Sequence, residues 1–185
     1  GFPWGIAEEV GKNIKLMEMF GMPGLKNLNE FFKIYKNKQF QTISLINKLN
    51  ESSKISYCPI SLGINFLDQI NLIYELKEVK FKNVAYPLLF LPFVSRASEV
   101  IGRRILLNID SIKFLLNFNQ SINSNFLKNM VVKEGNEIDL IIYENDNTFN
   151  NQEWEEIYKL SENTFVEENE NLKFKAAGAG LTDND

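Results

Sequence analysis

The residues best suited to bind an anion are three arginines that lie close together in the sequence. Arg96, Arg103 and Arg104 are the only arginines in the chain, and all three fall within residues 95–104. A guanidinium group is a planar fork that can hold a carboxylate or a phosphate through two parallel hydrogen bonds, which a lysine cannot do. These three residues are therefore the candidates for binding an anionic ligand.

Carboxylates are the candidate catalytic groups. Glu8 and Glu9 are adjacent near the start of a predicted helix, and Asp183 and Asp185 lie at the C-terminus. A positioned carboxylate could transfer a proton. The plainer interpretation is that the two glutamates have no catalytic role and lie there because negative charge is favourable near the positive end of the helix dipole. The two aspartates equally suit a solvated tail, and because their spacing matches no recognised metal loop, we expect no metal site.

The arginine segment also has a structural interpretation. If residues 95–103 form a helix, Arg96, Glu99 and Arg103 lie on one face at spacings of three and four. An internal ladder of exposed ion pairs is then favoured, worth only a few tenths of a kcal/mol per pair. An anion site, or a buried pair from an arginine to Glu8 or Glu9, remains the alternative. Trp4 is a further candidate ligand contact, although it is also interpreted, with other N-terminal aromatic residues, as part of the core.

Composition excludes several classes of site. The chain has no histidine, which removes catalytic triads and imidazole metal sites, and one cysteine, which removes disulfides and thiolate metal cages. Cys58 precedes Pro59 and is interpreted as a buried small hydrophobe rather than a nucleophile. A net charge of −4 gives no reason to expect nucleic acid. No apolar run reaches the roughly 20 residues of a membrane span, so we expect a cytoplasmic protein without a membrane partner. The cofactor and the oligomeric state stay unknown.

The first half of the chain reads as mostly helical. Apolar residues recur at every third or fourth position over residues 4–20, which predicts a helix, and Pro23 begins a second one. The remaining predictions for this half are a short third helix in residues 37–54 and a strand over 55–60. Residues 63–76 fit neither the helical nor the strand period cleanly, and a helix is preferred there over a strand.

The second half reads as mostly β-structure. Residues 84–93 are apolar with two prolines, which predicts a buried extended segment leading into a helix at 95–103. Later predictions are a strand pair at 104–109 and 112–118, a hairpin of 130–133 with 138–143, a helix on the sheet at 152–165, and polar loops at 117–129 and 145–151. The chain is thus predicted as one α+β domain, residues 1–185, with an N-terminal helical pair, a mainly antiparallel sheet, a C-terminal helix and a Gly-rich acidic tail at 176–185.

Three motifs resemble a known family. They are the segment WGIAEEVG at residues 4–11, Cys58–Pro59 with Gly63, and AAGAGLTDND at residues 176–185. They are similar to motifs of a bacterial family catalogued as domain of unknown function 3726, and the resemblance spans nearly the whole chain, although the middle matches only loosely. It implies a shared fold and no transferable catalytic residue. It also implies a short segment ahead of the first motif, which this chain lacks, and it raises interest in the acidic residues of the first and last motifs.

Two functions follow from these residues. In the first, the protein binds an anionic small molecule, with the arginines as ligands, and the carboxylates could add catalysis; whether it is an enzyme stays open. In the second, it is a non-catalytic accessory subunit that binds a partner protein, which the absence of histidine and of any nucleophile–base pair favours. The two are nearly level, and the ligand site is slightly preferred because rare arginines, adjacent acids and an acidic tail occur together.

Overall fold

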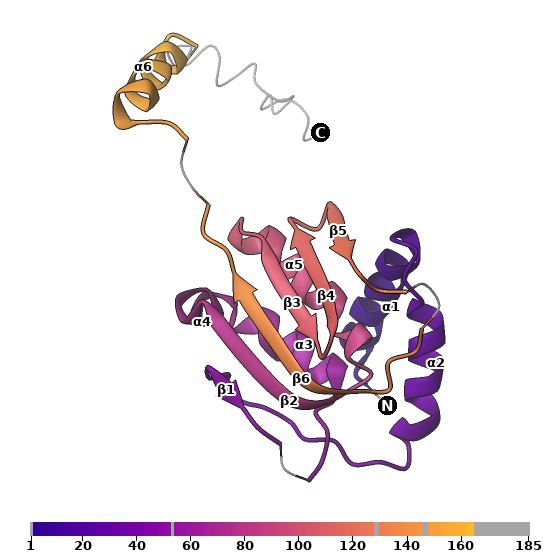
Figure 1. Cartoon of the computed structure of the whole chain (residues 1–185). Coiled ribbons are helices and arrows are strands. Elements are labelled where there is room, and N and C mark those ends of the chain that lie inside the picture. The colour runs from indigo at the N-terminus through magenta and orange to yellow at the C-terminus, as the bar shows by residue number, and fades with distance from the viewer. Residues whose placement is uncertain (1, 53, 128–129, 146–147, 165–185) are drawn as a thin grey trace, which may run out of the picture. The chain divides into compact units, whose positions relative to one another are not determined.

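A computed structural model describes residues 2–52, 54–127, 130–145 and 148–164 of the 185-residue chain (Figure 1). These residues fall into two units, 1–145 and 146–185, each described by itself. The elements of the first unit are α1 (Trp4–Met19), α2 (Gly24–Tyr35), β1 (Leu49–Asn50), α3 (Pro59–Asp68), α4 (Ile70–Leu76), β2 (Glu78–Ala85), the 3₁₀ helix η1 (Pro87–Leu89), α5 (Leu91–Ile101), β3 (Ile105–Ile109), β4 (Ile112–Asn117), β5 (Ser121–Ser124) and β6 (Glu134–Ile142). The second unit contains α6 (Asn151–Glu162).

The strands form one mixed sheet of six in the order β1-β2-β6-β3-β4-β5. Every neighbouring pair is antiparallel except β1 and β2, which run parallel. This arrangement confirms the predicted α+β fold with a mainly antiparallel sheet. The predicted pair at 104–109 and 112–118 is confirmed as β3 and β4, joined by a tight turn in which Asp110 adopts a positive φ of 50°.

The core lies on one face of this sheet. In the register, Leu107 of β3 faces Phe114 on one side and Leu140 on the other, and all three are buried. Their neighbours on the opposite face are partly buried or exposed, as the alternation of a strand requires. Figure 1 shows α3 and α5 behind the sheet, so the buried strand residues pack towards these helices.

The predicted N-terminal helical pair is confirmed as α1 and α2. Val10, Ile14 and Met17 form the buried stripe of α1. Gly21, which follows the end of this helix, has a φ of 70° and turns the chain away from the helical direction. At Gly24 a Cβ atom would lie 3.0 Å from Cβ of Met17, so the glycine allows α2 to begin close against α1.

Residues 37–54 do not form the predicted third helix. Only the two-residue strand β1 is regular there, and polar side chains bind the backbone in place of helical hydrogen bonds. Asn50 accepts from the amide of Asn47 and donates to its carbonyl, while Gln69 accepts from the amide of Ile46. Asparagine and glutamine side chains that satisfy nearby backbone groups remove the advantage of the helix.

Two predicted extended segments are wrong because proline begins helices there. Residues 55–60 contribute only single bridges from Tyr57 to Gln41 and Val84, and Pro59 starts α3. In residues 84–93, β2 ends at Ala85 and α5 starts at Leu91, four residues earlier than predicted. Proline is tolerated in the first turn of a helix because its missing N–H would have no partner there. The helix predicted over 63–76 is confirmed as the helices α3 and α4.

The predicted hairpin of residues 130–133 with 138–143 is also wrong. Residues 134–142 form the single strand β6, which lies between β2 and β3 and pairs with both. Gly135 is a strand residue, not a turn residue. A Cβ atom at this position would lie 3.1 Å from Cγ of Pro87, so the glycine admits the proline ring. Two further strands were not predicted: β2, and β5 within the predicted polar loop.

The predicted C-terminal helix is confirmed as α6, described within its own unit. Asn150 accepts a hydrogen bond from the amide of Glu153 and the Glu153 carboxylate accepts from the amide of Asn150, which completes a capping box. The rings of Phe149 and Trp154 are 5.8 Å apart and form a hydrophobic staple around this start. The predicted position of this helix on the sheet and the assignment of the whole chain to one domain stay predictions. The predicted tail, 176–185, lies outside the described residues.

Candidate functional site

Arg96 forms an ion pair with Glu9 and so joins α5 to α1. The Nη1 atom of Arg96 donates a hydrogen bond to Oε2 of Glu9, although 87 positions separate the two residues in sequence. Both side chains are about one-third exposed, with fractions of 37% for Arg96 and 35% for Glu9. This pairing was the less favoured of the sequence interpretations, and the pair is half-buried rather than buried.

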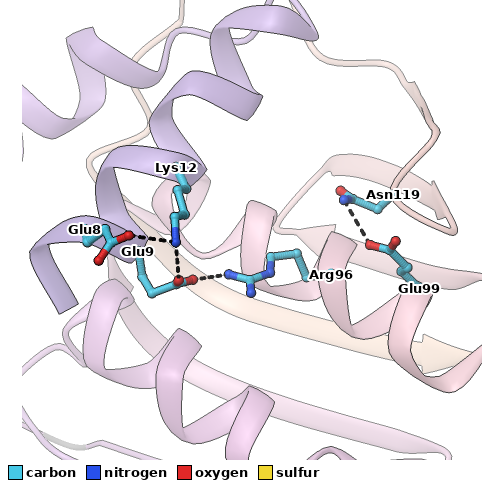
Figure 2. Close-up of polar contacts among 6 residues, drawn as sticks. All are labelled: Glu8, Glu9, Lys12, Arg96, Glu99 and Asn119. Carbon is cyan, nitrogen blue, oxygen red and sulfur yellow. Dashed lines mark hydrogen bonds and ion pairs between the residues drawn. The ribbon is translucent and has the colours of Figure 1, made fainter. Parts of the chain in front are cut away.

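Lys12 extends the pair into a cluster of four charges (Figure 2). Its Nζ atom lies 2.9 Å from Oε1 of Glu8 and 3.4 Å from Oε1 of Glu9, one helical turn away in each case. We call Glu8, Glu9, Lys12 and Arg96 the α1–α5 cluster. Two carboxylates face two cations, so the cluster has no net positive charge with which to hold an anion.

The cluster keeps Glu9 ionised. The hydrogen bond from Arg96 lowers the pKa of Glu9 below its ordinary value of 4.5, and Lys12 lowers it further, against a smaller opposing effect of burial. A general base works best when its pKa is close to the operating pH. Glu9 is therefore a weak proton acceptor at neutral pH, and its geometry is that of a structural ion pair.

The predicted ladder of Arg96, Glu99 and Arg103 does not form. The Glu99 carboxylate accepts a hydrogen bond of 3.1 Å from Nδ2 of Asn119 (Figure 2). Arg103 lies beyond the end of α5, because Gly102 adopts a left-handed conformation with a φ of 60° and terminates the helix. The residue therefore leaves the helical face on which the ladder depends.

Arg103 has partners of its own. Its Nη1 atom donates to the carbonyl of Gly102 at 3.0 Å, and its Nε atom lies 3.6 Å from Oε2 of Glu144, which is an ion-pair distance too long for a hydrogen bond. The guanidinium carbon lies 5.8 Å from the ring centroid of Tyr74. Arg103 thus faces a carboxylate, as Arg96 does, at a separate place in the fold, and it shares that carboxylate with Lys77.

The remaining sequence candidates do not join these residues. Arg104 is exposed, and its backbone carbonyl accepts from the amide of Tyr143. Trp4 begins α1 with 80% of its surface exposed, so the interpretation of this residue as core is wrong. Asp183 and Asp185 lie outside the described residues. The structure therefore brings together Glu8, Glu9 and Arg96 and leaves Trp4, Arg103 and Arg104 elsewhere.

A pocket of about 620 Å³ lies between α2 and α3. We call it the α2–α3 pocket, and its lining residues are Phe32, Tyr35, Lys36, Lys38, Phe40, Thr42, Cys58 and Ser61. Pockets of this volume are the usual size for small-molecule sites, and a few polar groups in a mainly apolar wall are typical of them.

The fold explains how these residues meet. The amide of Gln41 donates to the carbonyl of Ser56 at 2.9 Å, and Gln41 bridges to Tyr57 in parallel, so the segment after α2 runs beside the segment before α3. Phe40 and Thr42 are thereby placed next to Cys58. Pro59 then starts α3, whose first turn contains Ser61, so the pocket lies at the positive end of a ten-residue helix.

The charge of this lining differs from that of the α1–α5 cluster. Of the described residues that line it, Lys36 and Lys38 are the charged ones. Lys38 has one loose ion pair, 3.8 Å from Oε1 of Glu134, with both side chains well exposed. Among the described residues Lys36 has no ion pair. The pocket therefore offers positive charge that the fold leaves largely uncompensated.

Phe31 forms the floor beneath the pocket rings. It is fully buried, and its ring centroid lies 5.7 Å from that of Phe32, 5.4 Å from Tyr35 and 5.5 Å from Phe40. These separations are normal for aromatic pairs in contact. The three pocket rings therefore pack on Phe31, which is itself fully buried in the core.

Sequence reasoning missed this pocket. The stretch FFKIYKNKQF at residues 31–40 interleaves aromatic residues with lysines, which is a signal of an amphipathic binding surface. We interpreted its first part as core and its last part as the start of a polar helix. The pairing of Gln41 with Tyr57, which closes the pocket, has no signature in the local sequence.

The sequence model of the family described as protein of unknown function (DUF3726) matches residues 1–57 of the chain. The match confirms the resemblance over this stretch, which contains the motif at residues 4–11 and six of the eight residues that line the α2–α3 pocket. The other two motifs, at Cys58–Gly63 and at residues 176–185, lie beyond the matched stretch, and there the resemblance stays a prediction. No curated protein and no solved structure matches the chain. Within the described part of the chain, no helix has both the length and the apolar character needed to cross a membrane.

Proposed function

We propose that this protein binds a small anionic molecule in the α2–α3 pocket. The observation that carries the proposal is the lining itself, which places Lys36 and Lys38 in a pocket of about 620 Å³ whose wall, as far as the structure describes it, contains no carboxylate. The anionic ligand is the one expected from the sequence, but the place differs, because Arg96 and Arg103 both face carboxylates.

The surroundings of the lysines support the same ligand. Backbone N–H groups in the first turn of a helix point out of its N-terminus without partners in the helix, and the helix dipole favours negative charge there. In the pocket this end is α3, which begins at Pro59. A ligand between the lysines and α3 would therefore meet positive potential from both sides.

Titration with an inorganic anion tests the proposal. We expect pyrophosphate to raise the melting temperature of the intact chain, and calorimetry to show an affinity that falls as the salt concentration rises. The double variant Lys36→Gln/Lys38→Gln should weaken binding about tenfold, equivalent to about 1.4 kcal/mol. Lys15→Gln on the exposed side of α1 removes one charge far from the lining and is the matched control.

Two results would contradict the proposal. One is the absence of any shift with pyrophosphate, phosphate or citrate. The other is an equal loss of affinity in Lys15→Gln, which would indicate that only net charge matters. An Arg103→Ala variant measured in parallel separates this pocket from the arginine site expected from the sequence, because loss of binding in that variant alone would favour the arginines. Catalysis by Glu8, Glu9, Asp183 or Asp185 stays a prediction.

A second function is favoured by α6. Trp154, Ile157 and Tyr158 recur along one side of this helix and are exposed within its unit, while its flanks contain four glutamates and one lysine. The capping box and the staple allow the helix to begin without support from other elements. Such a helix suits a partner protein that offers an apolar groove with basic residues on its rim. This is the accessory-subunit alternative expected from the sequence.

Photo-cross-linking in the full chain tests this alternative. A photoreactive amino acid at Tyr158 should cross-link one partner protein, and the yield should fall with added salt and in an Ile157→Asp variant. The same group at Glu156, on the opposite side of the helix, should give little product. Cross-links only within the chain, or only between its copies, would contradict the partner protein.

A further inference from the structure

The aromatic wall of the α2–α3 pocket indicates what kind of molecule carries the anion. Phe32, Tyr35 and Phe40 contribute three rings to a lining of eight residues. Phe32 is 42% exposed, although the pair Phe31 and Phe32 would ordinarily bury both rings in a core. Exposed rings beside a pocket typically mark a binding surface.

The orientation of the rings favours a flat ligand. Tyr35 and Phe40 are nearly parallel, with an interplanar angle of 18° and centroids 5.9 Å apart, while Phe32 stands at 89° to Tyr35. Two parallel rings and one perpendicular ring offer both the stacked and the edge-to-face contact that aromatic groups prefer. A saturated, puckered ring can direct C–H groups at a ring face but cannot stack in parallel on it.

The rings are also arranged before any ligand arrives. Phe31 contacts all three from below, and Phe2 lies 4.9 Å from Tyr35 by ring centroids. A site that is already ordered loses less conformational entropy on binding. The aromatic wall can therefore contribute to ligand affinity without rearrangement of the core.

The distance from ring to cation sets the position of the negative charge. The Nζ atom of Lys38 lies 6.0 Å from the centroid of Phe40. An anionic group bonded directly to a ring that stacks on Phe40 would therefore lie within reach of the ammonium group. A long flexible chain between ring and anion is not required by this spacing.

We propose that the ligand of the α2–α3 pocket is a flat aromatic ring system with a carboxylate or phosphate attached directly to it. This inference rests on the proposed anion-binding function and adds the body of the ligand to it. The pocket volume of about 620 Å³ has room for two fused rings, so the probe is 2-naphthoate.

The experiment compares 2-naphthoate with its saturated counterpart, decahydronaphthalene-2-carboxylate, by calorimetry on the full chain. The two probes have the same charge and nearly the same size, but only the first is flat. We expect naphthoate to bind about fivefold more tightly, as ring contacts of ordinary strength predict.

Variants test whether the preference for the flat probe comes from the aromatic wall of the α2–α3 pocket. Phe40→Leu should abolish the preference for the flat probe and leave most of the affinity for the saturated one. Phe32→Leu, at a more exposed position, provides the same test with less risk to folding. Trp4→Leu removes an exposed ring outside the pocket and should leave both affinities unchanged.

The outcomes separate the two proposals. If neither probe binds although pyrophosphate does, the anion-binding function stands and the aromatic ligand is wrong; if pyrophosphate also fails to bind, the anion-binding function itself is wrong. If both probes bind equally and the double lysine variant weakens both, the function stands and the aromatic ligand is wrong. If naphthoate is preferred but Trp4→Leu removes the preference, the ligand lies elsewhere and this inference is overturned.

Discussion

The α1–α5 cluster and the α2–α3 pocket both contain two cations, and they use them differently. In the cluster, Arg96 and Lys12 face Glu8 and Glu9, and the four charges fasten one helix to another. In the pocket, Lys36 and Lys38 lie in a lining that includes aromatic rings and the start of a helix, and the one ion pair there is the loose pair of Lys38 with Glu134. The difference teaches that the surroundings of a cation, and not the rarity of its residue type, decide whether it is available to a ligand.

The largest effect should come from the floor of the pocket. Phe31→Ala removes a fully buried ring that contacts several others, and we expect unfolding free energy to fall by about 3–5 kcal/mol. Phe32→Ala, at the adjacent exposed position, should cost far less and mainly weaken ligand binding. Urea unfolding with calorimetry on the same samples measures both. Equal losses of stability in the two variants would show that the pocket wall is ordinary core.

An intermediate effect is expected at the contact that the two regions share. Gly63 lies in α3, and a Cβ atom there would be 2.2 Å from Cδ2 of Phe93, a buried residue of α5. Gly63→Ala should therefore lower the unfolding free energy by about 1–3 kcal/mol and shift α3 away from α5.

The matched control is Gly11→Ala, a helical glycine of α1 with open space around its Cβ position. This variant should raise the unfolding free energy by about 0.5–1 kcal/mol, because alanine favours the helix more than glycine does. Urea titration measures both changes. A Gly63→Ala protein as stable as the parent would contradict the close packing of α3 on α5.

The smallest effect should come from the cluster, and it should depend on pH. Arg96→Gln removes a half-exposed ion pair, for which about 0.5–1 kcal/mol of stability is expected at pH 7. The pKa of Glu9 is lowered in the folded state, so its contribution is present above the ordinary value of 4.5 and is lost as the pH falls through the lowered pKa.

The difference between parent and variant should therefore shrink towards zero at about pH 2, where carboxylates are protonated. Urea titrations at both pH values measure it, with Lys15→Gln as a control for general charge. A difference that persists in acid would mean that Arg96 acts through packing of its side chain rather than through its charge.

Sequence reasoning succeeded where the determining contacts are local. The helical stripe of α1, the turn at Asp110 between β3 and β4, and the helix α6 are all read from neighbouring positions. It failed where a distant partner decides. From its neighbours in sequence Gly135 is interpreted as a turn residue, whereas in the structure it is a strand residue that leaves room for the ring of Pro87.

The candidate site shows the same limit. The three arginines were conspicuous because most cations of the chain are lysines. A guanidinium that suits a ligand carboxylate is equally suited to a carboxylate of the protein, and Arg96 is already paired with Glu9. Which of the two applies depends on how α1 packs on α5. The pocket lysines were visible in the sequence, but their significance depends on the contact of residues 40–42 with residues 56–58, which no local pattern encodes.

The position of β6 in the sheet has a consequence for how the protein is made. Among the described strands, β2 with β1, and β3 with β4 and β5, are two separate blocks that meet only through β6, the last of these strands to be synthesised. Until residue 142 leaves the ribosome, both blocks present an unpaired inner edge, and such edges invite pairing with other chains. The nascent protein therefore needs protection from aggregation until β6 has paired with β2 and with β3.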